Sequence, residues 1–211
     1  MFGIWNRFKK KRNLSSLKDD EFRFLFDEDT SGEYVVFDTE TTGLNPKEDD
    51  ILSIGAVKIR DNKILTSETF EVFLKNSQNI SAKSIEIHGI RPIDLENAKE
   101  PYEAIKEFLH FIGSRTLVGY YLEFDINMIN KYTTKMLGIT LPNKTIEVSE
   151  IYFDKTIELI PQGNVDLRFD TILKKCGVPD MGAHNAVNDA IMTAMIYLKL
   201  TKEKKDAKTD I

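Results

Sequence analysis

The stretch from Tyr34 to Leu44, Tyr-Val-Val-Phe-Asp-Thr-Glu-Thr-Thr-Gly-Leu, decides how this chain folds. It opens with four apolar or aromatic residues of high β-propensity, so the pattern predicts a buried strand. Asp38 and Glu40 follow at i and i+2, which places both carboxylates on the same face of that strand. Two neighbouring negative charges repel each other, and a divalent cation would relieve the repulsion. The alternative interpretation is an ordinary strand end whose acids are solvated.

The residues after the acid pair favour a turn close to a ligand. Thr41, Thr42 and Gly43 end the strand in a turn whose backbone can approach a bound molecule. Leu44 then adds an apolar side chain beside the acids.

Composition sets the broad class of the protein. The chain has 211 residues, 41% of them hydrophobic, which suits one globular domain with short extensions. No apolar run is long enough to cross a bilayer, and residues 1–12 lack the apolar core of a signal peptide, so we expect a cytoplasmic protein without a membrane span. The single Cys176 excludes an internal disulfide and a cysteine-rich metal site, so any metal would be held by oxygen. The net charge of −5 argues against a protein that coats nucleic acid by charge alone, but not against a substrate with phosphates.

The ends of the chain differ from its middle. Residues 1–12 combine aromatic with basic side chains, which fits either a short helix packed on the domain or a basic arm for a membrane surface or a nucleic-acid backbone. The pattern at 17–29 predicts a helix at one edge of the sheet, and the charge-rich residues at the C-terminus predict a frayed tail. We therefore expect a domain over 33–200, an N-terminal extension over 1–32 and a tail over 201–211.

The middle of the chain alternates strand and helix patterns. These predict a strand at 51–59, a second near 64–74, an irregular polar stretch at 81–95, a helix at 101–112, a strand at 116–119, an amphipathic helix that begins near Asp125, a strand at 145–151 and a helix at 166–176. His88, in the polar stretch, is either a substrate contact or a structural hydrogen-bonding residue. Taken alone, Asp125 is explained by the favourable position of an acid at a helix N-terminus.

The last helical segment reads His-Asn-Ala-Val-Asn-Asp-Ala from His184. A five-residue offset turns about 140° around a helix, so His184 and Asp189 cannot share a face if both are helical. We therefore expect His184 in the preceding loop, from which it can swing over a site that Asp189 reaches from the first turns of the helix. Three small residues would let this helix pack closely on the acid-bearing strand: Ala186, Ala190 and Ala194.

Three motifs of the chain together resemble the exonuclease motifs of the DEDDh group of 3′–5′ exonucleases, which includes the proofreading epsilon subunit of bacterial replicative DNA polymerase. The motifs are Asp38-x-Glu40, Phe124-Asp125 and His184-x-Ala186-x-x-Asp189-Ala190. The resemblance covers about residues 33–200, and the segment around His88 also looks like one common in the group. It implies a ribonuclease H-like α/β domain, with a mixed sheet and helices on both faces.

The resemblance also implies roles for the motif residues. Four carboxylates would hold two divalent ions, Mg²⁺ or Mn²⁺, roughly 4 Å apart. Asp38 would bridge both ions, Glu40 and Asp189 would support the one that activates water, and Asp125 would support the other. His184 would act as the general base, since histidine is the residue type that titrates near neutral pH. The residues that seat the terminal nucleotide would be Thr41, Gly43, Leu44 and His88.

The function implied is a metal-dependent exonuclease that releases nucleoside 5′-monophosphates from single-stranded 3′ ends, with DNA as the expected substrate. A proofreading subunit within a polymerase complex, an exoribonuclease and a non-catalytic nucleic-acid-binding relative remain alternatives. Few residues follow the last helix, and the pattern at 162–167 is only faintly like a sliding-clamp peptide, so no polymerase or clamp partner is indicated. One departure concerns Tyr120-Tyr121, where many relatives carry His-Asn: it leaves open how the second motif is braced and how the penultimate nucleotide is held.

Overall fold

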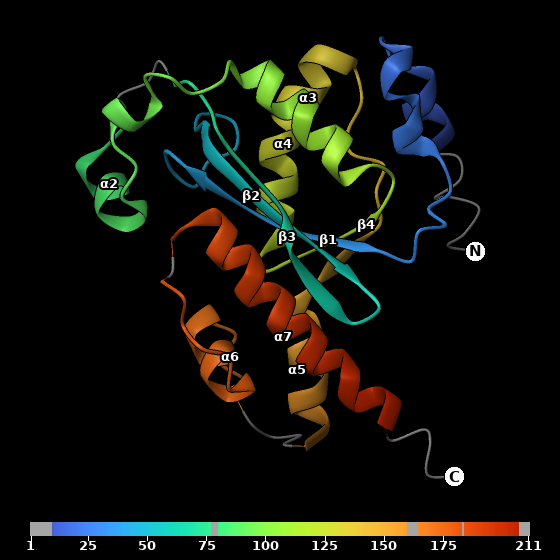
Figure 1. Ribbon diagram of the computed structural model, residues 1–211, viewed down its shortest axis with the longest axis vertical. Helices are drawn as coiled ribbons and strands as arrows, with labels where there is room; N and C mark the ends of the chain where they lie inside the picture. Colours follow the sequence, from blue (N-terminus) through green and yellow to red (C-terminus); the bar gives the residue numbers. More distant parts are fainter. Residues whose placement is uncertain (1–9, 77–79, 160–163, 183, 207–211) are drawn as a thin grey trace.

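A computed structural model of the chain describes residues 10–76, 80–159, 164–182 and 184–206. Its strands are β1 (Tyr34–Thr41), β2 (Ile51–Arg60), β3 (Lys63–Phe73), β4 (Thr116–Gly119) and β5 (Thr145–Glu147). Its α-helices are α2 (Ala82–His88), α3 (Pro101–Ile112), α4 (Leu122–Leu137), α5 (Val148–Leu159), α6 (Phe169–Cys176) and α7 (Ala186–Asp206). Two short 3₁₀ helices are η1 (Asp20–Phe26) and η2 (Pro92–Leu95). The strands form one sheet in the order β3-β2-β1-β4-β5 (Figure 1).

The acid-bearing strand β1 lies at the centre of this mixed sheet. It pairs antiparallel with β2 along its whole length, and β2 pairs antiparallel with β3 as the predicted hairpin. On its other side β1 runs parallel to β4, but only Tyr34, Val35 and Val36 have partners there. Past Val36, no strand of the described residues pairs with this edge of β1, and the candidate site lies at that opening.

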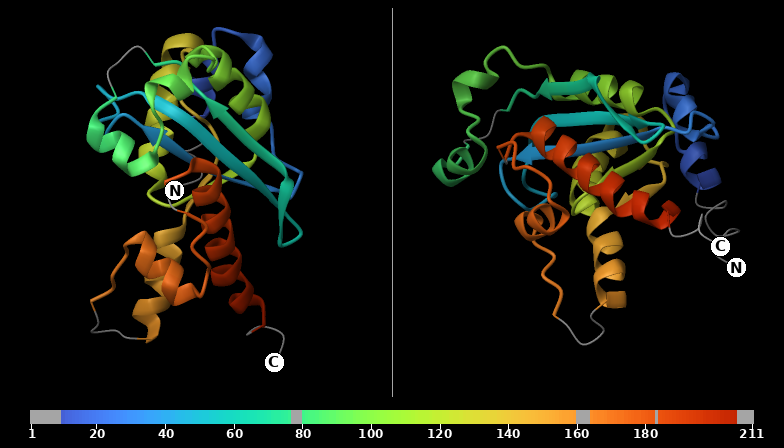
Figure 2. Two further views of the ribbon diagram at one scale, coloured as in Figure 1. Left: turned by 60° about the vertical axis from the view of Figure 1, so that its left-hand side comes forward. Right: turned by 60° about the horizontal axis from the view of Figure 1, so that its bottom comes forward.

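Helices cover both faces of the sheet, as predicted (Figure 2). Val35 and Phe37 of β1 are buried in a core with α3 and α4, whereas Val36 is buried in a second core with α5, α6 and α7. Because side chains alternate along a strand, Asp38 and Glu40 share the face of Val36 and point toward α7. Thr39 lies between them and shares the face of α4.

Helix α7 approaches the sheet unusually closely. A Cβ atom on Gly55 of β2 would lie 2.2 Å from the backbone carbon of Ala186 and the backbone nitrogen of Val187. Gly55 is also the residue paired with Asp38 across the sheet. The predicted close packing of the alanine-rich helix is confirmed, since Ala186, Ala190 and Ala194 are all buried. The first turn of α7 is thereby held against β2 at the residue that pairs with Asp38.

The structure corrects two predictions for the middle of the chain. Residues 81–95 are not irregular: Ser81 caps α2 through a hydrogen bond to the Ser84 N–H, and Gly89 ends the helix in the left-handed conformation. The strand predicted at 145–151 ends at Glu147, and α5 follows directly. Its β-branched residues satisfy a strand pattern, which hid the start of the helix.

Two further helices are shorter than predicted. The helix expected at 166–176 begins at Phe169, because Asp166 turns back to bind the Arg168 side chain and backbone N–H. The segment at 17–29 contains only η1, which buries Phe22 and Leu25 in the core with α3 and α4.

The predicted basic arm lies largely outside the described residues, whereas the predicted frayed tail is wrong for residues 201–206, which continue α7 as helix. Residues 10–15 form a helix, but 1–9 and 207–211 are not described, and neither are 162 and 163 of the clamp-like pattern. Among the described residues, no helix combines the length and the apolar character that crossing a membrane requires.

Candidate active site

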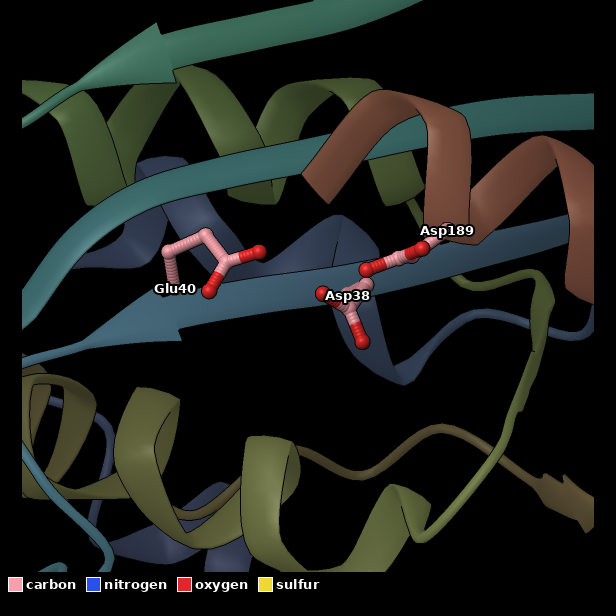
Figure 3. A group of neighbouring side chains, drawn as sticks. All are labelled: Asp38, Glu40 and Asp189. Carbon is pink, nitrogen blue, oxygen red and sulfur yellow. The ribbon is translucent and has the colours of Figure 1, made fainter. Parts of the chain in front are cut away.

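Three carboxylates from two elements meet at the end of β1. Each of Asp38, Glu40 and Asp189 offers an oxygen atom, and these atoms all lie within 4.8 Å of one another. Figure 3 shows the two β1 side chains and the α7 side chain turned toward a common space. Glu40 is buried, while Asp38 and Asp189 are half-buried.

Asp189 is held by the loop that precedes its helix. Its Oδ2 accepts a hydrogen bond of 2.9 Å from the backbone N–H of His184. His184 lies in that loop, as predicted, is exposed, and has a left-handed backbone with φ of 68°. The other oxygen of Asp189, Oδ1, is buried, and no described residue hydrogen-bonds it. A buried carboxylate oxygen without a partner is costly, which makes it a candidate ligand atom for a cation.

Asp125 reaches the site from the opposite face of the sheet. It lies in the first turn of α4, is 3% exposed, and accepts hydrogen bonds at Oδ1 from the Thr39 N–H (3.0 Å) and the Thr39 hydroxyl (2.5 Å). The carboxylate of Glu147, at the end of β5, accepts the N–H groups of Tyr121 and Leu122 and so caps α4. The structure therefore brings Asp125 near the other three acids but not into their group.

The four acids share a strongly unfavourable electrostatic environment. Burial first, and then the charge of Asp189, raises the pKa of Glu40 from 4.5 to about 7. Burial raises the pKa of Asp189 to about 6. The pKa values of Asp38 and Asp125 are also raised, chiefly by burial; for Asp38 the charges of Asp125, Glu40 and Asp189 add to it. Among the described residues, no lysine or arginine forms an ion pair with any of the four acids.

This set of residues fits a divalent metal. Carboxylate oxygens are the ligands that Mg²⁺ and Mn²⁺ prefer, and a cation would compensate the charges that protein groups leave uncompensated. Oδ1 of Asp189, which no described residue hydrogen-bonds, supplies one such ligand atom.

The turn after β1 is rigidly organised by Asp49. Its carboxylate accepts hydrogen bonds from the Thr42 hydroxyl (3.0 Å) and the Asn45 N–H (2.8 Å). A Cβ on Gly43 would lie 2.6 Å from Oδ2 of Asp49, so a larger residue there would require the Asp49 side chain to move. Leu44, between them, is 83% exposed. The backbone of the turn that carries the predicted substrate contacts is thus held by Asp49, and Leu44 presents its apolar side chain to solvent.

His88 is tied into the protein through both ring nitrogens. Its Nδ1 accepts the Ile90 N–H (3.0 Å), and its Nε2 lies 2.7 Å from the Ser84 hydroxyl, which in turn donates to the Thr41 carbonyl (3.2 Å). Burial, followed by the nearby His184, lowers the pKa of His88. These contacts connect α2 to the end of β1 through His88 and Ser84. Because both ring nitrogens already have partners, a substrate would contact the carbon atoms of the His88 ring.

The two tyrosines have separate environments. The Tyr120 hydroxyl donates to the Leu167 carbonyl (2.9 Å), and its ring packs against Phe169. Tyr121 is 71% exposed, and its ring stacks beside Phe124. Both line an open pocket of about 730 Å³ whose other lining residues are Ser149, Asn164, Val165, Asp166, Leu167 and Arg168. The second motif is braced by Thr39, which binds Asp125, and by Glu147, which accepts the backbone N–H groups of Tyr121 and Leu122.

Sequence reasoning missed three residues that position the acids. Gly55 admits α7, Thr39 binds Asp125, and Glu147 caps the helix that carries Asp125. Thr39 left one usable signal, because a threonine between two acids on a strand places a hydroxyl on the opposite face. Gly55 and Glu147 act through contacts between segments far apart in sequence, and the pattern around each gives no such signal.

Comparison with known proteins places the chain in a family. The model of the RNase T family, described as exonuclease, matches residues 35–197. The chain belongs to this exonuclease family. The predicted resemblance to 3′–5′ exonucleases and the predicted enzyme class are thereby confirmed at the level of the family.

The similar proteins include polymerase components and free exonucleases. A PolC-type DNA polymerase III from Thermotoga maritima is 32% identical over 205 residues, which cover 96% of this chain but 14% of that protein. The DNA polymerase III subunit epsilon of Aquifex aeolicus is 28% identical over 82% of each chain. E. coli Exonuclease I, in complex with a dT13 oligonucleotide, aligns with a TM-score of 0.67 at 17% identity over 85% of this chain and 43% of that one. The last likeness concerns the fold, and it confirms the predicted ribonuclease H-like architecture.

Proposed function

We propose that the protein is a 3′–5′ exonuclease that releases nucleoside 5′-monophosphates from single-stranded 3′ ends by metal-dependent hydrolysis. The observation that carries this proposal is the group of three carboxylates within 4.8 Å, with Asp125 beside it and no lysine or arginine among the described residues to neutralise it. Membership of the exonuclease family supplies the reaction class.

We propose that these acids hold two divalent ions, Mg²⁺ or Mn²⁺. Asp38 would serve both ions, Glu40 and Asp189 the ion that activates water, and Asp125 the other ion. When bound, such a pair supplies positive charge at the attacking and leaving oxygens of the displaced phosphate. The positions of the acids support this assignment, since Asp38, Glu40 and Asp189 form one group and Thr39 holds Asp125 on the other face of β1.

The chain's own contribution to the chemistry is placement and proton transfer. A water oxygen would attack the terminal phosphorus, the bond from phosphorus to the 3′ oxygen of the preceding nucleotide would break, and His184 would take a proton from the water. The leaving 3′ oxygen ends as a hydroxyl by accepting a proton from solvent. The exposure of His184 beside Asp189 supports this role, because the ring can turn toward the acids without displacing core residues.

Substrate seating would fall to the turn after β1. We propose that the backbone of Thr41 and Gly43, the exposed Leu44 and the ring of His88 hold the terminal nucleotide, contacts that ignore base identity. DNA is the favoured substrate, because the similar Exonuclease I was solved with dT13 and dA16 oligonucleotides. We also propose that the exonuclease domain spans 33–200, that 1–32 and 201–211 are extensions, and that the protein acts in the cytoplasm.

A second candidate is the same activity serving a polymerase. It is favoured by the 32% identity to a PolC-type polymerase over 96% of this chain, although the chain spans only 14% of that protein. Co-elution of the purified chain with the replicative polymerase subunit of the same cell on size-exclusion chromatography would support this candidate. Separate elution at micromolar concentrations would count against it.

The test of the proposal is a cleavage assay with end-labelled substrates. Single-stranded DNA labelled at its 5′ end should shorten one nucleotide at a time with Mg²⁺ or Mn²⁺, and an excess of EDTA should stop the reaction. Matched single-stranded RNA in the same assay decides the sugar preference. Intact DNA and RNA at all metal conditions would leave the non-catalytic binding module as the better account.

A further inference from the structure

Thr39, the residue between the two acids of β1, makes contacts that the proposed chemistry does not yet use. Its side chain is 7% exposed and faces α4, whereas Asp38 and Glu40 face α7. Its backbone N–H and its hydroxyl both donate to Oδ1 of Asp125. Two donors from one residue on a single carboxylate oxygen fix both the position and the orientation of that carboxylate.

The sheet explains why this contact forms. Pairing between β1 and β4 ends at Val36, so the Thr39 N–H has no strand carbonyl opposite it on that edge. Buried N–H groups need an acceptor, and Asp125 in the first turn of α4 provides one. Because α4 begins just after β4, the same break in the sheet both creates the free donor and brings the acceptor to it.

The consequence is a fixed distance between the fourth acid and the other three. Asp38, Thr39 and Glu40 are consecutive residues of one strand, so the backbone that displays two acids on one face also grips Asp125 on the other. Asp125 is close enough to raise the pKa of Asp38, yet it lies outside the group of three. Without the Thr39 hydroxyl, the Asp125 carboxylate would keep two backbone donors, the N–H of Thr39 and its own N–H.

We propose that Thr39 is a positioning residue that sets where the Asp125 carboxylate binds metal. This inference rests on the proposed function, because it assumes that the acid cluster binds divalent ions. The competing explanation is purely structural: a buried threonine that satisfies its own hydroxyl. Hydrogen bonds to metal ligands typically change metal affinity by about 10-fold to 100-fold, whereas a structural threonine would change stability alone.

The test is Mn²⁺ binding by the full chain, measured by isothermal titration calorimetry in the absence of nucleic acid. Thr39→Val keeps the shape of the side chain and removes the hydroxyl, and it should weaken Mn²⁺ binding about tenfold or more. Thr39→Ser is the matched control, because it keeps the hydroxyl, and it should bind Mn²⁺ with nearly the affinity of the wild type. Thr39→Ala is a second variant without the hydroxyl and must show the same loss, which keeps the test valid should the valine variant fail to fold.

A double-mutant cycle with Asp125→Ala shows whether Thr39 acts through Asp125. Once Asp125 is absent, Thr39→Val should cause no further loss of Mn²⁺ affinity. An equal loss in both backgrounds, or wild-type affinity in both Thr39→Val and Thr39→Ala, would overturn the inference while leaving the proposed function intact. Absence of Mn²⁺ binding by the wild-type protein would overturn both.

Discussion

A buried acid lies at each end of strand β1, and the two acids differ in whether an arginine or lysine compensates their charge. At the start, Glu33 is 6% exposed, and its carboxylate accepts hydrogen bonds from the guanidinium groups of Arg60 and Arg115, the latter at 2.6 Å. At the end, Asp38 and Glu40 meet Asp189 without a lysine or arginine partner among the described residues.

The pKa values follow this difference in partners. Burial acts to raise the pKa of Glu33, but the hydrogen bonds from Arg115 and Arg60 outweigh it, so the pKa is lowered. Burial of Glu40, with no such partner, raises its pKa to about 7. Burial alone therefore does not mark a functional acid. A buried acid without a positively charged protein partner is a candidate ligand for a bound cation. At the end of β1, a divalent cation fits this description.

The largest effect should come from removing a carboxylate at the unpaired end. Asp38→Asn or Asp189→Asn should cost at least about 3 kcal/mol of transition-state stabilisation, or about a hundredfold in rate, because metal positioning is lost. Single-turnover release of nucleotides from labelled DNA measures this. The fold should survive, since one uncompensated charge is removed, and circular dichroism checks that. Wild-type rates in both variants would show that the unpaired end is not the active site.

The next effect concerns His184, which stands beside the unpaired end. A general base contributes about two to four orders of magnitude, so His184→Ala should lose rate on that scale while keeping Mn²⁺ affinity. The wild-type rate should rise with pH, because only the neutral imidazole accepts a proton, and that limb of the pH profile should vanish in the variant. Rate against pH at saturating Mg²⁺ measures both. A limb that persists unshifted in His184→Ala assigns the titration to another group.

The paired end should respond in stability and not in activity. Arg115→Met removes one of the two partners of Glu33 and leaves a buried carboxylate half compensated, which should lower the free energy of unfolding by roughly 2 kcal/mol. Urea unfolding at neutral pH measures the change, and the cleavage rate at a temperature where the variant is folded should match that of the wild type. A large loss of rate in the folded variant would mean that the two ends are coupled, against the contrast drawn above.

The two ends should also give opposite dependence of stability on pH in metal-free buffer. Glu40 and Asp189 have raised pKa values, about 7 and about 6, so their contribution is fully present below the ordinary carboxyl pKa and is lost as pH rises through those values. Glu33 has a lowered pKa, so its contribution is lost only as pH falls below the ordinary range. The melting temperature in EDTA should therefore fall from about pH 5 to about pH 8, and Glu40→Gln should flatten the slope. A flat profile in the wild-type protein would contradict the raised values.

The sequence predicted the acids at the end of β1, because their placement follows from patterns within short segments. The acid pair follows from the two-residue period of a strand, and the loop position of His184 follows from the five-residue offset to Asp189, so both were found without the structure. The family motifs then linked these segments. The buried Glu33 could not be found in this way, because its partners lie far along the chain at Arg60 and Arg115.

The missed features share that non-local cause. Gly55 matters only because α7 passes over it, and α5 was hidden by β-branched residues that also suit a strand. Helix α2 was missed because Ser81 and Gly89, its caps, also suit an irregular loop. Local sequence patterns thus predicted which acids share a face of the strand. The packing between segments far apart in sequence decides which of the buried acids have a positively charged partner.

The most direct test of the account is the effect of Mn²⁺ on thermal unfolding of three proteins: the wild type, Asp38→Asn and Arg115→Met. A ligand present at about one hundred times its dissociation constant adds about 2.7 kcal/mol, so the wild-type melting temperature should rise on the order of 5 °C or more. Arg115→Met should melt lower but show the same rise, because its metal site is intact, whereas Asp38→Asn should show little or none. An equal rise in all three proteins, or none in the wild type, would contradict the claim that the unpaired acids of β1 form a metal site.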